Sequence, residues 1–171
     1  MNMPEIVFVM SHYYSNYNVH YDDYDHKNIM GVYVTNKGEI KFFDFGKFTH
    51  TETYSIPDVY DQLEEATCDD VVISENIRLD ELLDYYELLM NIDKDAEINA
   101  YQNYEDVIYG QYNWYGLRSN SEGTQELIYI YGFGDAIYEN KDINAQDLYM
   151  TIGIFIEDIY RQIDYKIEEE E

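Results

Sequence analysis

Apolar positions along the chain follow two spacings, one typical of strands and one typical of helices. Short runs rich in β-branched and aromatic residues predict strands. These runs cover residues 5–10, 29–35, 39–45, 111–118 and 126–133, with a brief buried strand at 71–74. Asn36-Lys37-Gly38 separates the second run from the third, so these two strands are expected to form a hairpin.

Helical spacing predicts three amphipathic helices. The first begins at Ser55, which can cap it, has Pro57 in its first turn and ends near Thr67. The second covers about residues 79–92, and the third begins at the cap Asn144. The expected inward series of these two helices are Leu79, Leu82, Leu83, Tyr86 and Leu89, then Leu148, Ile152, Phe155, Ile159 and Ile163.

The remaining segments lack either spacing. Residues 11–28 are polar and rich in tyrosine, which predicts a long loop, and residues 166–171 form an acidic tail expected to fray. No internal repeat and no linker rich in Pro, Gly or Ser divides the chain. We therefore expect one domain over residues 1–171, of the α+β class, with antiparallel strands and about three packed amphipathic helices.

Charge sets this chain apart from most folded domains. It carries 36 acidic and 10 basic residues, for a formal net charge of −26. Duplex DNA carries one charge per 1.7 Å, so the protein has the charge of roughly 44 Å of duplex. A disordered acidic tail is excluded because 46% of residues are apolar and 17% are aromatic. Codon bias toward AT-rich codons would also enrich lysine, yet the chain has only seven.

Cysteine content and hydropathy indicate the compartment. Cys68 is the single cysteine, so no internal disulfide can form. No secretory signal is visible at the start, and the longest nearly apolar run, residues 148–156, is too short to span a bilayer. These features predict a soluble cytoplasmic protein.

Metal chemistry has one candidate segment. His12, His20 and His26 share the expected loop with three aspartates, residue types that bind zinc or iron, but their spacing matches no compact ligand motif. A solvated acidic loop is the alternative. Asp93-Lys94-Asp95-Ala96-Glu97 begins like a calcium loop but has Ile98 where the glycine belongs and Tyr104 where the last acidic ligand belongs. We expect no metal and no other cofactor.

Other catalytic motifs are missing from the sequence. Cys68 precedes Asp69-Asp70, whose charges disfavour a thiolate, and neither a nucleophile elbow nor a phosphate loop occurs. Direct nucleic-acid binding is disfavoured because phosphate contacts require Lys and Arg. The sequence therefore predicts a protein that is not an enzyme and does not contact nucleic acid directly.

Acidic residues repeatedly stand beside tyrosines. Carboxylates can take the place of phosphates before Arg and Lys, and tyrosine rings can stack on guanidinium groups as bases do. Burial of some tyrosines in a core is the simpler explanation for their number, but it does not explain the excess of acids. The pattern occurs in Tyr21-Asp22-Asp23-Tyr24-Asp25, Asp84-Tyr85-Tyr86-Glu87, Tyr104-Glu105-Asp106, Tyr138-Glu139 and Asp164-Tyr165.

In size, acidity and aromatic content, the whole chain resembles the nucleic-acid-mimic inhibitors of phages and mobile elements. These include anti-restriction and anti-CRISPR proteins. Such families share no fold, so the resemblance transfers no residue. It implies a partner: the basic nucleic-acid-binding surface of a defence nuclease. An immunity protein or antitoxin that covers a basic nuclease toxin would follow the same physics, and a small metal-dependent enzyme is a third possibility.

Fixed arrays of acids on regular elements are the expected partner-binding sites. One lies on the second helix, one in the long loop and one around the end of the first helix. The residues are Asp80, Glu81, Asp84, Tyr85 and Glu87; then Tyr21, Asp22, Asp23, Tyr24 and Asp25; then Glu64, Glu65, Asp69 and Asp70.

Overall fold

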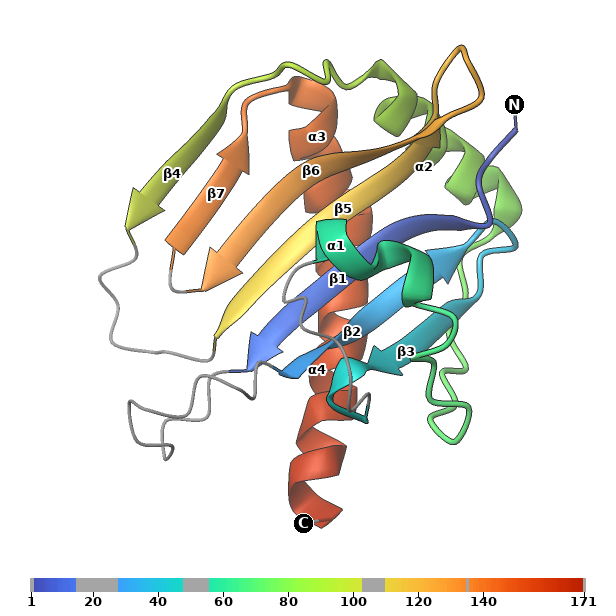
Figure 1. The fold of residues 1–171 in the computed structure, drawn as a ribbon, viewed down its shortest axis with the longest axis vertical. Coiled ribbons are helices and arrows are strands. Elements are labelled where there is room, and N and C mark those ends of the chain that lie inside the picture. Colours follow the sequence, from blue (N-terminus) through green and yellow to red (C-terminus); the bar gives the residue numbers. More distant parts are fainter. Residues whose placement is uncertain (1, 15–27, 48–55, 103–109, 135, 171) are drawn as a thin grey trace.

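A single antiparallel sheet of seven strands forms the centre of the described structure, a computed structural model that describes residues 2–14, 28–47, 56–102, 110–134 and 136–170 (Figure 1). The order of the strands across the sheet is β3-β2-β1-β5-β6-β7-β4. The strands are β1 (Ile6–Tyr14), β2 (Asn28–Thr35), β3 (Ile40–Asp44), β4 (Ile98–Gln102), β5 (Gln111–Ser119), β6 (Gln125–Gly134) and β7 (Ala136–Asn140).

The predicted hairpin between the second and third strands is confirmed. β2 and β3 pair antiparallel, and the amide of Gly38 donates a 2.9 Å hydrogen bond to the carbonyl oxygen of Thr35. Gly38 has a φ of +82°, a conformation that glycine adopts without steric cost. β1 lies between β2 and β5, which makes it a central strand buried on both faces.

The expectation of about three packed helices is wrong. Only two long helical segments occur among the described residues: α2 (Leu79–Asn91) and a C-terminal helix. The C-terminal helix is continuous through α3 (Ile143–Leu148), the π-helical segment η3 (Tyr149–Gly153) and α4 (Ile154–Glu170). The remaining helical segments are the short turns η1 (Phe45–Lys47), α1 (Ile56–Val59) and η2 (Tyr60–Gln62).

Backbone pairing with the sheet explains why the first predicted helix is so short. The carbonyl oxygen of Ala66 accepts a 3.0 Å hydrogen bond from the amide of Asp44, and the amide of Cys68 donates one of 3.0 Å to Phe42. These groups therefore bond to β3 and do not continue a helical ladder. Residues 71–74, predicted as a strand, lie in irregular structure beside this edge.

Three strand assignments also change. β4 and β7 were not predicted, and they lie together at the other edge of the sheet. Ser11 to Tyr14, expected in the long loop, continue β1 because β2 and β5 pair with this segment on both sides. The remainder of that loop, residues 15–27, lies outside the described residues, and the predicted tail is helical to Glu170.

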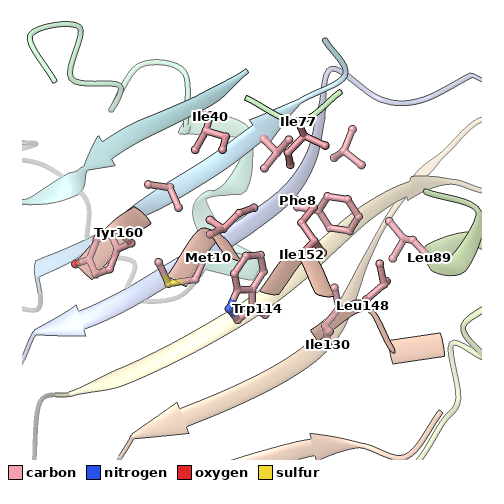
Figure 2. Packing of buried hydrophobic residues seen from close by; sticks show 14 of the residues in the cluster. Phe8, Met10, Ile40, Ile77, Leu89, Trp114, Ile130, Leu148, Ile152 and Tyr160 are labelled. Atoms are coloured by element: carbon pink, nitrogen blue, oxygen red, sulfur yellow. The ribbon is translucent and has the colours of Figure 1, made fainter. Parts of the chain in front are cut away.

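Each face of the sheet carries its own apolar cluster. One cluster joins the sheet to α2 and the C-terminal helix, which crosses behind the strands in Figure 1. Figure 2 shows this packing around Phe8, Met10, Trp114 and Ile152. The second cluster lies on the opposite face under α1 and η2 and includes Ile56, Val59, Leu63 and Ala66. None of the described helices is long and apolar enough to cross a membrane.

Candidate partner-binding surface

A long segment of the described chain, residues 61–87, is rich in exposed acidic residues, and we call it the acidic band. It contains ten carboxylates and a single basic residue, Arg78. All ten acidic residues are exposed, so their charges face solvent and are available to a partner. They are Asp61, Glu64, Glu65, Asp69, Asp70, Glu75, Asp80, Glu81, Asp84 and Glu87.

The acidic band passes from one face of the sheet to the other around the edge strand β3. At its start, Leu63 and Ala66 are buried in the cluster under α1 and η2. At its end, Leu82 and Leu89 are buried in the cluster on the opposite face. Figure 1 shows α1 in front of the strands and α2 behind them. Apolar anchors at both ends therefore fix the position of the acidic side chains between them.

Three of the four predicted acidic residues on α2 form a row along its solvent side. Leu82, Tyr86 and Leu89 are buried, which turns Asp80, Asp84 and Glu87 outward with helical spacing. The row spans about 10 Å at 1.5 Å per residue. One strand of duplex DNA carries a phosphate about every 3.4 Å, or about three to four over that length. The row has three carboxylates over that length, and one of them pairs with Arg78, so its net charge density is lower than that of one DNA strand.

The first turn of α2 also contains the one cation of the band. Arg78, the N-cap residue, forms a bidentate ion pair with Asp80, and both side chains are largely exposed. Desolvation raises the pKa of Asp80, whereas the hydrogen bonds and positive charge of Arg78 lower it by more, so the pKa lies below its usual value. Within the described residues, Glu81, Asp84 and Glu87 form no ion pair.

The third predicted group lies where the band passes β3. Glu64, Glu65, Asp69 and Asp70 are exposed at or just after the turns that follow η2. Beside them is a groove of about 270 Å³ between β3 and residues 67–76, lined by Glu39, Lys41, Asp69 and Glu75 among others. Cys68 is buried in the floor of this region and donates a weak hydrogen bond through Sγ to the carbonyl oxygen of Ala66 at 3.8 Å.

Tyr85 and the residues of the long loop were also predicted to bind the partner. Tyr85 is half-buried and packs against the core, and desolvation, then the charges of Glu81 and Asp84, raise the pKa of its phenol. It therefore presents only part of its ring to a partner. The predicted residues of the long loop, Tyr21, Asp22, Asp23, Tyr24 and Asp25, lie outside the described residues.

The histidine cluster is only partly described. His12 lies on β1 and is fully buried, with Nδ1 2.7 Å from the hydroxyl of Tyr160 and its ring stacked on Tyr112 at 4.1 Å. His20 and His26 lie outside the described residues. Within the described ranges, no group of three or more His, Cys, Asp or Glu residues is placed to hold a metal ion.

Sequence reasoning missed several exposed apolar residues on both helices. Leu79 and Leu83 were expected to face the core, yet they are 55% and 43% exposed. The fully buried residues of α2 are Leu82, Tyr86 and Leu89, with Tyr85 and Leu88 partly buried beside them, so Leu79 and Leu83 fall outside the inward side of the helix. Phe155 was also expected inside and is 42% exposed, because the π-helical segment shifts the helical register ahead of it. Asp61 and Glu75, which the predicted patches left out, extend the acidic band.

Comparison of the chain with protein-family models, curated proteins and solved structures gave no match.

Proposed function

We propose that this protein is an inhibitor that binds the basic nucleic-acid-binding surface of a defence nuclease, a CRISPR effector or a restriction enzyme. The observation that carries the proposal is the acidic band, with ten exposed carboxylates and one basic residue wrapped around the β3 edge. The site of action is then the cytoplasm of the cell that holds the nuclease. In this role the protein is not an enzyme and needs no cofactor.

Physical arguments favour a basic protein as the partner. A surface that binds phosphates presents Arg and Lys side chains, and carboxylates satisfy the same donors in similar geometry. Because the backbone that carries these carboxylates is already ordered, a partner has to order only their side chains. The net charge of −26 also steers encounter with a positive surface and repels nucleic acid.

The test is competition for a nuclease. Purified protein is added to a panel of CRISPR effectors and restriction enzymes, and the binding of guide RNA or target DNA is followed by fluorescence anisotropy. At least one nuclease should lose nucleic-acid binding, and the inhibition should weaken steeply as salt rises. Unchanged nuclease–nucleic acid binding across the whole panel would contradict the proposal. Rescue of cells from one co-expressed nuclease toxin would favour the immunity-protein alternative.

A matched pair of variants distinguishes a shaped surface from bulk charge. The band variant combines Glu81→Gln, Asp84→Asn and Glu87→Gln. The control combines Asp95→Asn, Glu97→Gln and Glu122→Gln, which removes the same charge from exposed positions outside the band. The band variant should lose at least about tenfold in inhibition, which corresponds to about 1.4 kcal/mol, and the control about threefold or less. Equal losses would mean that only bulk charge matters.

A further inference from the structure

The C-terminal helix presents a row of large apolar side chains on its solvent side. Ile143 is 64% exposed, Met150 66%, Ile154 39% and Phe155 42%. We call these four residues the apolar row. Single exposed apolar residues are ordinary in folded proteins, but four on one helix of a chain this acidic form an unusual surface.

The π-helical segment helps to place this row. On the inner side of the helix, Leu148, Ile152, Ile156 and Tyr160 are buried against the sheet. Figure 2 shows Leu148, Ile152 and Tyr160 within that packing. The wider turn over Tyr149–Gly153 shifts the register, so Ile154 and Phe155 fall outside the buried series. Such segments occur frequently at functional sites.

Acidic residues accompany the apolar row. Asp147 and Asp158 are exposed on the same helix. The single basic residue between Ile143 and Ile163 is Arg161, and its guanidinium already pairs with the carboxylate of Glu157 at 2.5 Å. The surface around the row is therefore negatively charged. It complements a partner surface on which apolar side chains are flanked by Arg and Lys.

The apolar row lies on the same face of the sheet as the α2 end of the acidic band. α2 and the C-terminal helix pack on one face of the sheet in a shared apolar cluster. The amide of Asp93, just after α2, donates a 2.9 Å hydrogen bond to the carboxylate of Asp142, the N-cap of α3. Asn144 donates one of 3.3 Å from its side chain to the carbonyl oxygen of Asn91. One partner surface can thus contact both helices.

We propose that the apolar row is the salt-resistant part of the contact with the partner, and that it binds a protein surface whose apolar strip is flanked by Arg and Lys. This inference rests on the proposed function for the basic character of the partner. It adds that the partner binds this protein by burying apolar area as well as by pairing charges. A nucleic acid binds the same kind of surface without this apolar contact. A second copy of the chain is disfavoured as the occupant, since it would bring a further −26 charges and its own Asp147 and Asp158 to the same surface.

Charge-neutral substitutions test this inference on the nuclease that the wild-type protein inhibits. The row variant combines Met150→Gln, Ile154→Gln and Phe155→Gln, and the control combines Ile98→Gln and Tyr101→Gln, which are exposed residues outside both the row and the acidic band. Affinity for the nuclease is measured at 50 mM and 500 mM NaCl. We expect the row variant to lose at least tenfold at both salt concentrations with an unchanged salt dependence, and the control to lose less than threefold.

Each outcome is decisive. If the wild-type protein binds no nuclease of the panel, the proposed function fails and this inference fails with it. If the wild-type protein binds and the row variant binds equally well, only the apolar contact is overturned. Sedimentation velocity tests whether a second copy of the chain covers the row. If the wild-type protein is a dimer and the row substitutions dissociate it, the second copy is the occupant and the inference is overturned. Circular dichroism confirms that the row variant is folded.

Discussion

Arg118 on β5 donates a 2.7 Å hydrogen bond from Nη1 to the carbonyl oxygen of Ile92, the C-cap residue of α2. The same nitrogen lies 2.9 Å from the carbonyl oxygen of Leu89, and Nε pairs with Glu126 on β6 at 3.2 Å. A cation at this position satisfies carbonyl groups that a helix end leaves without partners and complements the negative end of the helix dipole. One buried side chain therefore joins the acidic helix to the sheet.

Replacing Arg118 with Met should destabilise the protein by about 2–4 kcal/mol, because the carbonyl groups of Leu89 and Ile92 lose a charged donor and Glu126 loses its partner. Urea unfolding followed by circular dichroism measures the change in the free energy of unfolding. Arg78→Met is the matched control: its ion pair with Asp80 is exposed, so the expected loss is below about 1 kcal/mol. Equal losses for the two variants would contradict the role given to Arg118.

A second contact between β5 and α2 requires glycine at position 116, where no side chain separates the strand from Leu89. A Cβ atom on Gly116 would lie 2.4 Å from Cδ1 of Leu89, which is fully buried. Gly116→Ala should therefore destabilise the protein by about 1–3 kcal/mol through overpacking. Urea unfolding of the Gly116→Ala, Leu89→Ala and double variants measures the coupling. The double variant should be more stable than the sum of the single effects predicts, because the new methyl group fills part of the space that Leu89 leaves. Additive effects would mean that the two residues do not touch.

Sequence patterns located the strands best where β-branched and aromatic residues were dense. β2, β3, β5 and β6 lie close to the predicted runs. β4 was missed because Asn99, Ala100 and Gln102 have low strand propensity, and its position is fixed by pairing with β7. The first helix was overestimated because its carbonyl and amide groups bond to β3, a tertiary contact that periodicity does not contain.

The candidate surface was predictable in part. Acidic residues on the outer side of α2 were expected to be exposed, and Asp80, Glu81, Asp84 and Glu87 are. The path of the acidic band around an edge strand was not predictable, because it depends on strand order. The apolar row was missed for a local reason: a π-helical segment breaks the 3.6-residue period, so Phe155 was assigned to the inner face.

Asp142 should make stability depend on pH at the acidic end. Its carboxylate accepts hydrogen bonds from the amides of Asp93 at 2.9 Å and Asn144 at 2.8 Å. Desolvation raises the pKa of this carboxyl, but these hydrogen bonds lower it by more, so it lies below its usual value. Because the pKa of Asp142 is lower in the folded state than in the unfolded state, its ionised carboxylate stabilises the protein at pH values above the unfolded pKa of about 3.9. This contribution is lost as the pH falls through the folded-state pKa.

The measurement compares wild type with Asp142→Asn by urea unfolding at several pH values. At pH 7 the variant should be less stable by about 1 kcal/mol, because asparagine retains one acceptor oxygen and loses the charge. The difference should shrink as the pH falls below about 4, where the wild-type carboxyl becomes protonated. Glu122→Gln removes an exposed charge and should stay within about 0.5 kcal/mol of wild type. A difference that does not change with pH would exclude this linkage.

Salt should stabilise this protein. A net charge of −26 repels itself more strongly in the compact state than in the extended chain, and salt screens that repulsion, with a Debye length of about 10 Å at 0.1 M and about 3 Å at 1 M. The melting temperature should therefore rise by several degrees between 20 mM and 500 mM NaCl, since about 1 kcal/mol shifts it by roughly 2–4 °C in a chain of this size. Differential scanning calorimetry measures it.

The acidic band should account for a disproportionate share of that effect, because its carboxylates lie close together. Glu64→Gln, Glu65→Gln and Asp70→Asn combined should raise the melting temperature at 20 mM NaCl and reduce its increase with salt. The control that combines Glu5→Gln, Glu97→Gln and Glu122→Gln removes the same charge from dispersed exposed positions and should do so less. If both variants behave alike, repulsion is spread over the whole surface. A melting temperature that falls with salt in the wild-type protein would show that attractive ion pairs outweigh repulsion, and the band would then be no array of uncompensated charge.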